Sequence, residues 1–326
     1  MLSEDGHERK YRTTEEQVRK TLDQAVDTRE FRDASLAVSR FLHKQVLNGG
    51  EPARELADAL HGKQLGHALH PALTAVTIGS WTTAFIYDIL SFLPGFKSAR
   101  KAADTLTFLG IISAAPTALT GLTDYTTIKK EAAHYGAVHA MLNSLALIFY
   151  TKSMVARLRG SRMSGRFFSL LGLSILTFSG WIGGELVYRY QIATNHGYDE
   201  GPEDWTQVLA ADALAEGTPT RAEVNEIPIL LFRQGENVYA IGATCSHAGG
   251  PLDEGRVVDD VCIECPWHQS VFDMRDGRVV HSPSTFNQPR YETRVRNGQI
   301  EIRRWQAERV SAREQVRAAY DSAMSR

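Results

Sequence analysis

Two short stretches of the chain carry residues that could bind metal. The first is Cys245-Ser246-His247 and the second is Cys265-Pro266-Trp267-His268, so each supplies one thiolate and one imidazole. Together they could hold a two-iron, two-sulfur cluster with both cysteines on one iron and both histidines on the other. Neutral imidazoles lower the net charge of such a cluster and favour its reduced state. The ligand count alone also allows a structural zinc ion.

The residues that follow the histidines favour the cluster. His247 precedes Ala-Gly-Gly-Pro-Leu and His268 precedes Gln-Ser-Val-Phe-Asp, with Gly277 beyond. Both loops closely resemble those of Rieske ferredoxins and Rieske oxygenases. The resemblance implies a [2Fe-2S] cluster bound by Cys245, His247, Cys265 and His268, which would carry single electrons. Zinc sites more often present their cysteines as Cys-x-x-Cys pairs, so zinc is the less favoured alternative.

The loops depart from those of the Rieske proteins of cytochrome bc complexes. The extra cysteines of those proteins correspond to Gly250 and Trp267, so no disulfide can join the loops. Their tyrosine donor corresponds to Phe272, whereas Ser270 matches their serine donor, and Gln269 stands where most family members have glycine. Because hydrogen bonds to the sulfurs help set the potential, we expect a potential below that of the bc-type proteins.

The segment around the two stretches has the pattern of an antiparallel β domain. Short alternating runs are separated by turn residues, and Asn297-Gly298 is a strong signal for a two-residue hairpin. The remaining thiol, Cys262, lies in one alternating run, where a small apolar strand residue is more common than a ligand. The expected strands are 227–232, 238–243, 256–258, 261–264, 278–280, 291–295 and 299–302.

Four long apolar segments precede this domain and predict a four-helix transmembrane bundle. Each approaches the twenty or so residues that cross a bilayer, and short polar turns separate them. Gly180 and Gly184 form a small-xxx-small pair that could let helices approach closely. The sequence Gly66-His67-Ala68-Leu69-His70-Pro71 at the entrance to the first span resembles that of a family of four-helix bacterial membrane proteins of unknown function, and the resemblance covers roughly residues 60–190. The expected spans are 71–93, 105–123, 134–152 and 169–188.

Up-and-down topology would bring several ionisable residues to one membrane face, and His70, His139 and Glu185 are the best candidates for a site. Such residues at membrane depth are costly and usually functional. His70 and His139 come from different spans, as two axial ligands of one haem iron would, so we hypothesise a haem b or a quinone there. Plain anchoring is the alternative, since nothing in the sequence marks a porphyrin pocket.

These patterns predict an α + β multidomain chain. The expected regions are 1–66, an N-terminal amphipathic helical region; 67–192, the four-span bundle; 193–222, a linker and the entry to the next domain; 223–305, the Rieske domain; and 306–326, a C-terminal helix. We expect a multi-pass protein of the bacterial inner membrane. The loops 97–101 and 157–166, at the membrane face away from the histidines, are positively charged, which predicts that this face is cytoplasmic and that the cluster lies outside. The charged N-terminus would then also have to cross the membrane, although it has no signal peptide.

Three functions are consistent with these regions. The preferred one is a membrane-anchored electron carrier whose partner is another redox protein or a quinone. A redox or iron sensor would use the same cluster, and an oxygenase would need a separate iron site of two histidines and one carboxylate that the sequence does not offer. No catalytic residue is identified. The net charge of −2 gives no sign of nucleic-acid binding, and the sequence allows a homo-oligomer.

Overall fold

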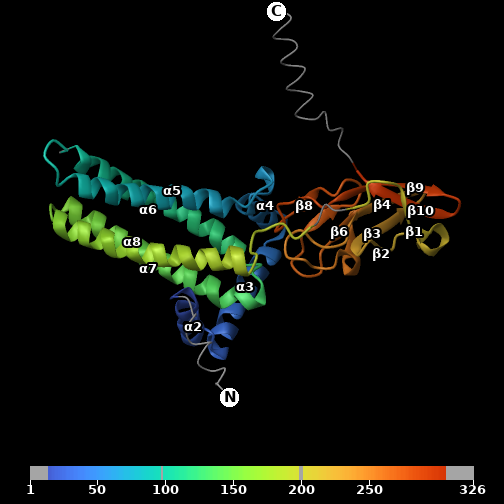
Figure 1. Cartoon of the computed structure of the whole chain (residues 1–326), viewed down its shortest axis with the longest axis horizontal. Helices are drawn as coiled ribbons and strands as arrows, with labels where there is room; N and C mark the ends of the chain where they lie inside the picture. Colours follow the sequence, from blue (N-terminus) through green and yellow to red (C-terminus); the bar gives the residue numbers. More distant parts are fainter. Residues whose placement is uncertain (1–13, 97, 198–200, 306–326) are drawn as a thin grey trace, which may run out of the picture. The chain divides into compact units, whose positions relative to one another are not determined.

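The computed structural model describes residues 14–96, 98–197 and 201–305. The chain divides into two compact units, Met1–Asn195 with His281–Thr285, and His196–Val280 with Phe286–Arg326. The first unit consists of helices in its described part and the second is built from strands (Figure 1). This confirms the predicted α + β class. The expected C-terminal helix at 306–326 lies outside the described residues.

The first unit begins with three helices, α2 (Thr14–Val26), α3 (Arg29–Asn48) and α4 (Gly50–His61). The Thr28 hydroxyl caps α3 by accepting a hydrogen bond from the backbone N–H of Phe31 at 3.3 Å. The Ser39 hydroxyl donates to the Tyr125 carbonyl at 2.9 Å, and the Tyr125 hydroxyl donates to the Ser35 carbonyl at 2.8 Å. These bonds attach α3 to the C-terminal end of the helix Ala99–Tyr125.

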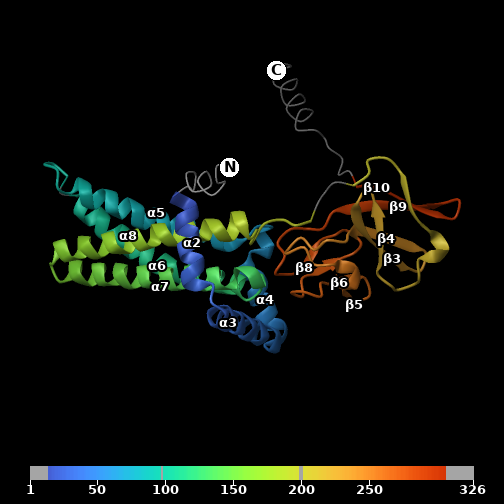
Figure 2. The same cartoon turned by 60° about the horizontal axis from the view of Figure 1, so that its bottom comes forward.

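Four long helices follow and pack as two antiparallel hairpins. The first hairpin pairs α5 (Leu69–Leu90) with α6 (Ala99–Tyr125), and the second pairs α7 (Ala133–Leu158) with α8 (Arg162–Gly184), which continues as a π-helical turn, Glu185–Arg189. Figure 2 shows the four helices side by side. Because α5 and α7 each pack on both α6 and α8, α5 and α7 occupy diagonal corners of the bundle.

Three of these helices, rather than the predicted four, are long and apolar enough to cross a membrane: Leu69–Leu90, Ala99–Tyr125 and Arg162–Arg189. The fourth helix, α7, falls short because it carries polar residues that include His139, Asn143 and Arg157. Large apolar side chains such as Ile112, Ile148 and Phe167 are exposed on the outer faces of the bundle. An apolar exterior of this extent is typical of a surface that faces lipid.

The second unit contains two antiparallel sheets. The larger sheet has the strand order β1-β10-β9-β4-β3-β2, and the smaller has the order β5-β6-β7-β8. The predicted hairpin at Asn297-Gly298 joins β9 to β10, with φ of 52° and 74° at the two turn residues, as a type I′ turn requires. The strands are β1 (Thr206–Ala210), β2 (Thr220–Val224), β3 (Ile227–Gln234), β4 (Asn237–Gly242), β5 (Arg256–Val258), β6 (Cys262–Glu264), β7 (Val271–Asp273), β8 (Val279–His281), β9 (Arg290–Arg296) and β10 (Gln299–Arg304).

Candidate functional site

The two ligand-bearing loops have the same backbone design. Each cysteine N–H donates to the carbonyl five residues later, from Cys245 to Gly250 and from Cys265 to Ser270, at 2.8 Å in both loops. Each cysteine carbonyl accepts from the N–H four residues later, from Gly249 at 2.9 Å and from Gln269 at 3.1 Å. The second loop closes the β6–β7 hairpin, whereas the first follows β4. In each loop, both backbone polar groups of the cysteine are therefore bonded to residues later in the same loop.

The structure brings the four predicted ligands together as two like pairs. The His247 and His268 rings lie 5.0 Å apart between centroids, and a hydrogen bond joins the Cys245 and Cys265 thiols. Both cysteines are buried, whereas both histidines are partly exposed. A two-iron cluster uses two cysteines at one iron and two histidines at the other, and this grouping by type matches that requirement. In the described ranges, no three or more His, Cys, Asp or Glu side chains form a site for a single metal ion.

Backbone donors surround both sulfurs. The N–H groups of His247 and Ala248 point at the Cys245 sulfur, and those of Trp267 and His268 point at the Cys265 sulfur. The hydrogen bond from Cys245 lowers the pKa of Cys265 to about 7, and the same bond, together with burial, raises the pKa of Cys245. The pair thus favours one thiolate, and its backbone donors would stabilise negative charge on both sulfurs when a metal replaces the shared proton.

Residues behind the loops bury the cysteines in the smaller core of the second unit. Phe272, fully buried, belongs to the same apolar cluster as Cys245 and Cys265. Trp267 lies against Gly250, where an added Cβ would come within 3.0 Å of both its indole and the Cys265 sulfur. These are the two positions at which the bc-type resemblance would place a disulfide. In this chain, contact between an indole and a glycine joins the loops there.

Cys262 lies on β6 and is buried, as the alternating pattern predicted. Burial raises the pKa of its thiol, which keeps it protonated and unreactive at neutral pH. It pairs with Asp273 across the β6–β7 ladder. We therefore assign it a packing role within the strand.

In the first unit, His70 and His139 face each other although they come from different hairpins. Their ring centroids are 6.5 Å apart and the ring planes are nearly perpendicular. Nδ1 of His70 lies 2.9 Å from the Thr117 carbonyl on α6, and Nδ1 of His139 lies 2.9 Å from the Ser179 carbonyl on α8. Each histidine is thus held by the other helix of its own hairpin.

Glu185, the third predicted residue, forms ion pairs with two arginines. Arg19 donates to both of its carboxylate oxygens, at 2.7 and 3.0 Å, and Arg189 lies 3.5 Å away one turn later. Its charge is therefore paired with α2 and with its own helical turn. This ion pair attaches α2 to the bundle.

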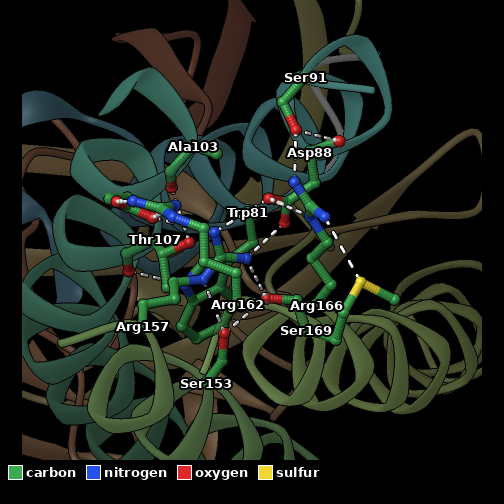
Figure 3. Close-up of polar contacts among 12 residues, drawn as sticks. Trp81, Asp88, Ser91, Ala103, Thr107, Ser153, Arg157, Arg162, Arg166 and Ser169 are labelled. Carbon is green, nitrogen blue, oxygen red and sulfur yellow. Dashed lines mark hydrogen bonds and ion pairs between the residues drawn. The ribbon is translucent and has the colours of Figure 1, made fainter. Parts of the chain in front are cut away.

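A buried network of charges lies at the opposite end of the bundle, and no sequence pattern predicted it. Arg157 donates to Asp88, with Nη1 2.9 Å from one carboxylate oxygen, and to Asp104 at 3.0 Å (Figure 3). Arg166 lies 3.6 Å from Asp88, and Arg162 lies 2.9 Å from Asp104. The arginines belong to the segment 157–166 that was expected to be a positively charged loop, whereas Arg157 lies at the end of α7 and Arg162 and Arg166 lie in the first turns of α8.

Comparison with known proteins places both units. Residues 204–292 match the family model of the Rieske [2Fe-2S] domain, and residues 66–196 match that of a predicted membrane protein family, DUF2231. The chain is 35% identical over 99 residues to the "Anthranilate 1,2-dioxygenase ferredoxin subunit" of Burkholderia cepacia, an alignment that covers 91% of that protein and 30% of this chain. The chain belongs to the Rieske [2Fe-2S] domain family. The resemblance of both units is thereby confirmed.

Other relatives of the Rieske domain are also ferredoxins. "Ferredoxin CarAc" of Metapseudomonas resinovorans is 34% identical over 99 residues, which cover 92% of that protein and 30% of this chain. A solved structure of the ferredoxin of carbazole 1,9a-dioxygenase from Nocardioides aromaticivorans IC177 is 32% identical, with a TM-score of 0.30 and coverage of 98% of that chain and 31% of this one. The ferredoxin relatives are thus similar to the second unit of this chain, and the DUF2231 family model matches the helical unit.

Proposed function

We propose that this protein is a membrane-anchored carrier of single electrons whose [2Fe-2S] cluster is held by Cys245, His247, Cys265 and His268. The observation that carries the proposal is the grouping of the four side chains by type, with the cysteines buried and the histidine rings paired 5.0 Å apart. When bound, the cluster would supply one-electron chemistry. The chain's own residues orient the ligands, direct N–H groups at the sulfurs and exclude water from the cysteine side.

The partial exposure of both histidines suggests where a partner would approach. An electron entering or leaving through the histidine side crosses less protein than one passing through the buried cysteines. The relatives are named as ferredoxin subunits of dioxygenases, which supports a redox protein as the partner. We propose that the same edge accepts the electron donor and presents the electron to the acceptor in turn.

The cluster assignment is tested on full-length protein made under iron-replete, anaerobic conditions. We expect two irons and two labile sulfides per chain and a Rieske-type electron paramagnetic resonance signal on reduction. Cys245→Ser should abolish the signal, because a thiolate ligand of the cluster is lost. Cys262→Ser is the matched control and should retain it, since Cys262 lies on a strand outside the ligand loops. Stoichiometric zinc in place of iron would overturn the assignment.

We propose that the helical unit anchors the carrier as a multi-pass protein of the bacterial inner membrane. Three apolar helices and the apolar exterior of the bundle support this location. We further propose that the unit holds a redox partner of the cluster, a haem b or a quinone, beside His70 and His139. Alkaline carbonate washing tests the anchoring: the protein should stay in the membrane pellet, and release of the intact chain would contradict the proposal.

A further inference from the structure

The two hairpins of the helical unit repeat the same arrangement of residues. On α5, Trp81 lies eleven residues after His70 and Asp88 seven residues after Trp81; on α7, Tyr150 and Arg157 follow His139 at the same spacings. The buried positions of the two helices agree as well, with Ala84 and Ser153 equivalent. The residue types differ enough to hide this repeat from inspection of the sequence.

The partner helices repeat in the same way. On α6, the His70 ring packs on Gly121 and the Trp81 ring on Gly110; an added Cβ would lie 2.7 Å from Cε1 of His70 and would overlap the indole. The corresponding glycines of α8 lie under the rings of His139 and Tyr150, where an added Cβ would lie 3.1 and 2.9 Å away. In each hairpin, the residue whose carbonyl accepts from the histidine lies four positions before the glycine that packs on the histidine ring. These α8 residues are Ser179, Gly183 and Gly172.

Equivalent residues meet their own counterparts between the hairpins. The rings of Trp81 and Tyr150 stack with centroids 3.9 Å apart and planes 4° from parallel. Asp88 forms an ion pair with Arg157 (Figure 3). His70 and His139 form the third such pair. Residues that contact their own equivalents lie on or near a two-fold axis. The helical unit is therefore an approximate two-fold pair of hairpins, with three layers of paired side chains along its axis.

The hydrogen bonds of His70 and His139 determine the tautomer of both rings. A carbonyl oxygen only accepts, so Nδ1 of each ring must carry a proton toward Thr117 or Ser179. In the neutral ring, Nε2 then carries the lone pair. The Asn143 amide nitrogen lies 3.0 Å from Nε2 of His139 and donates to that lone pair, so a metal that binds Nε2 would displace the Asn143 amide. Anchoring of Nδ1 to a backbone carbonyl is the arrangement that prepares a histidine to bind metal through Nε2.

We propose that His70 and His139 are the two axial ligands of one haem b iron on this axis, an inference that deepens the function proposed above and rests on it for the haem's role. Two Nε2–iron bonds of about 2.0 Å would set the ring centroids roughly 6.3 Å apart. The observed separation is 6.5 Å. A quinone bridging the two rings would need two hydrogen bonds of about 2.8 Å in addition to its own length, which exceeds this separation.

The neighbouring layers suit a flat macrocycle placed along the axis. Seven residues beyond each histidine stand Thr77 and Ala146, which are both small and buried. The bulky Trp81 and Tyr150 come only eleven residues on, about 16 Å deeper along a helix. The chain has three cysteines and no Cys-x-x-Cys-His sequence, so the porphyrin would be held by its axial ligands and by packing, as in haem b.

The test uses full-length protein purified in detergent from haem-replete cells. We expect one haem b per chain with the low-spin spectrum of two histidine ligands, and its loss in His70→Ala and in His139→Ala. Asn143→Ala is the matched control and should keep the haem, because Asn143 is not a proposed ligand and its amide must leave Nε2 of His139 when iron binds there. His139→Met should keep a haem with a changed spectrum and a raised potential, because methionine can replace an axial histidine.

The cluster signal of each sample serves as an internal check of folding. A haem-free protein that still shows its cluster signal would overturn this inference and leave the proposed carrier function intact. A protein with haem and no cluster would support this inference and overturn the proposed carrier function. Haem that survives both alanine substitutions, or a stoichiometric quinone in protein without haem, would also overturn the assignment to His70 and His139.

Discussion

Gln269 adopts the left-handed backbone conformation that Gly249 adopts at the same place in the other ligand loop. The φ angles are 60° at Gln269 and 84° at Gly249, and each residue donates its N–H to the cysteine four residues earlier. The shared loop design thus explains why most family members have glycine where this chain has Gln269. A side chain in this conformation costs about 1–2 kcal/mol relative to glycine.

Substitutions at Gln269 should separate this strain from any role of its side chain. Gln269→Gly should retain the cluster signal and hold or raise the free energy of unfolding by up to about 1 kcal/mol, because relief of strain exceeds the added entropy of the unfolded chain. Gln269→Val should lower it by about 1 kcal/mol or more, because β-branched residues tolerate positive φ poorly. Thermal bleaching of the cluster absorption measures both. Equal stability of the two variants would show that the strain argument fails.

Phe272 gives a second prediction at the scale of one residue. Its ring packs in the core that contains both cysteines, at the position where the bc-type resemblance places a tyrosine. Phe272→Tyr should raise the midpoint potential by roughly 40 mV, because one added hydrogen bond worth about 1 kcal/mol would favour the reduced cluster. Redox titration checks this. Phe272→Leu is the control, and a similar rise in that variant would assign the change to packing instead.

At the scale of helices, close packing of the bundle depends on glycines other than those that the sequence suggested. A Cβ at Gly180 would meet no atom within 4 Å, and one at Gly184 would meet only the Tyr188 ring, at 3.9 Å. Gly110 and Gly172, by contrast, lie directly under Trp81 and Tyr150. The small-xxx-small prediction was therefore wrong about which glycines allow close approach. The spacing rule detects small residues, but the ring that covers a glycine comes from another helix.

Alanine substitutions at two helical glycines should have opposite effects. Gly110→Ala should lower the free energy of unfolding by about 1–3 kcal/mol, because its methyl group would overlap the Trp81 indole. Gly180→Ala should leave it unchanged or raise it by up to about 1 kcal/mol through helix propensity. Thermal unfolding in detergent compares the two. Equal destabilisation would mean that the loss of backbone freedom, and not the indole, dominates.

Tyr150 offers a further prediction for the stacked layer. Its hydroxyl is buried and has no hydrogen-bond partner among the described residues, which costs about 1–3 kcal/mol. Tyr150→Phe keeps the stack with Trp81 and should raise the free energy of unfolding by about 1 kcal/mol. Tyr150→Ala removes the stack and should lower it by about 3–5 kcal/mol. A less stable Phe variant would imply that the hydroxyl binds a water molecule or a ligand in the purified protein.

At the scale of the whole molecule, each unit has its own core. The second unit has two apolar clusters, one behind the ligand loops and one between β1, β2 and β10, with Leu252 and Ile300 fully buried in them. The ferredoxins that resemble this unit are proteins of similar length, since 99 aligned residues cover 91% of one of them. These observations predict that the second unit folds without the helices.

Expression of residues 201–305 alone tests this independence. We expect a soluble protein with the same cluster signal as the full chain, because the ligand loops and both apolar clusters are included. The Cys245→Ser form of the same fragment is the control and should lack the signal. An insoluble or cluster-free fragment, beside a full chain that holds its cluster, would show that the helical unit is needed for assembly.

The charge network changes how the membrane orientation is read. Arg157 is almost completely buried and pairs with Asp88 and Asp104, and Arg166 lies close to Asp88. The loops 97–101 and 157–166 contain seven lysines and arginines in the sequence. Lys97 lies outside the described residues, and Arg157 and Arg166 belong to the bundle interior. The positive-inside argument therefore rests on fewer free charges. Reporter fusions after residue 196 are expected to place the second unit outside, as the loops predict.

The sequence by itself determined the features that depend on local pattern. Ligand spacing and the flanking glycines identified the Rieske loops, apolar runs identified the helical bundle, and Asn297-Gly298 identified a hairpin. Each of these signals is contained in a few consecutive residues or in one repeating period, so it can be read without knowledge of the fold. The count of apolar spans was too high by one, because polar residues such as His139 and Asn143 make α7 less apolar than the other three long helices.

Only the tertiary structure showed which distant residues meet. The pairs His70–His139, Trp81–Tyr150 and Asp88–Arg157 join residues that are 69 positions apart. Their equivalence is hidden because the paired residues differ in type, with an aspartate opposite an arginine. Glu185 was grouped with the histidines because all three were expected at one membrane face, but its partner is Arg19. Contacts of this kind depend on how helices turn their faces toward each other, and that is decided by packing of the whole bundle.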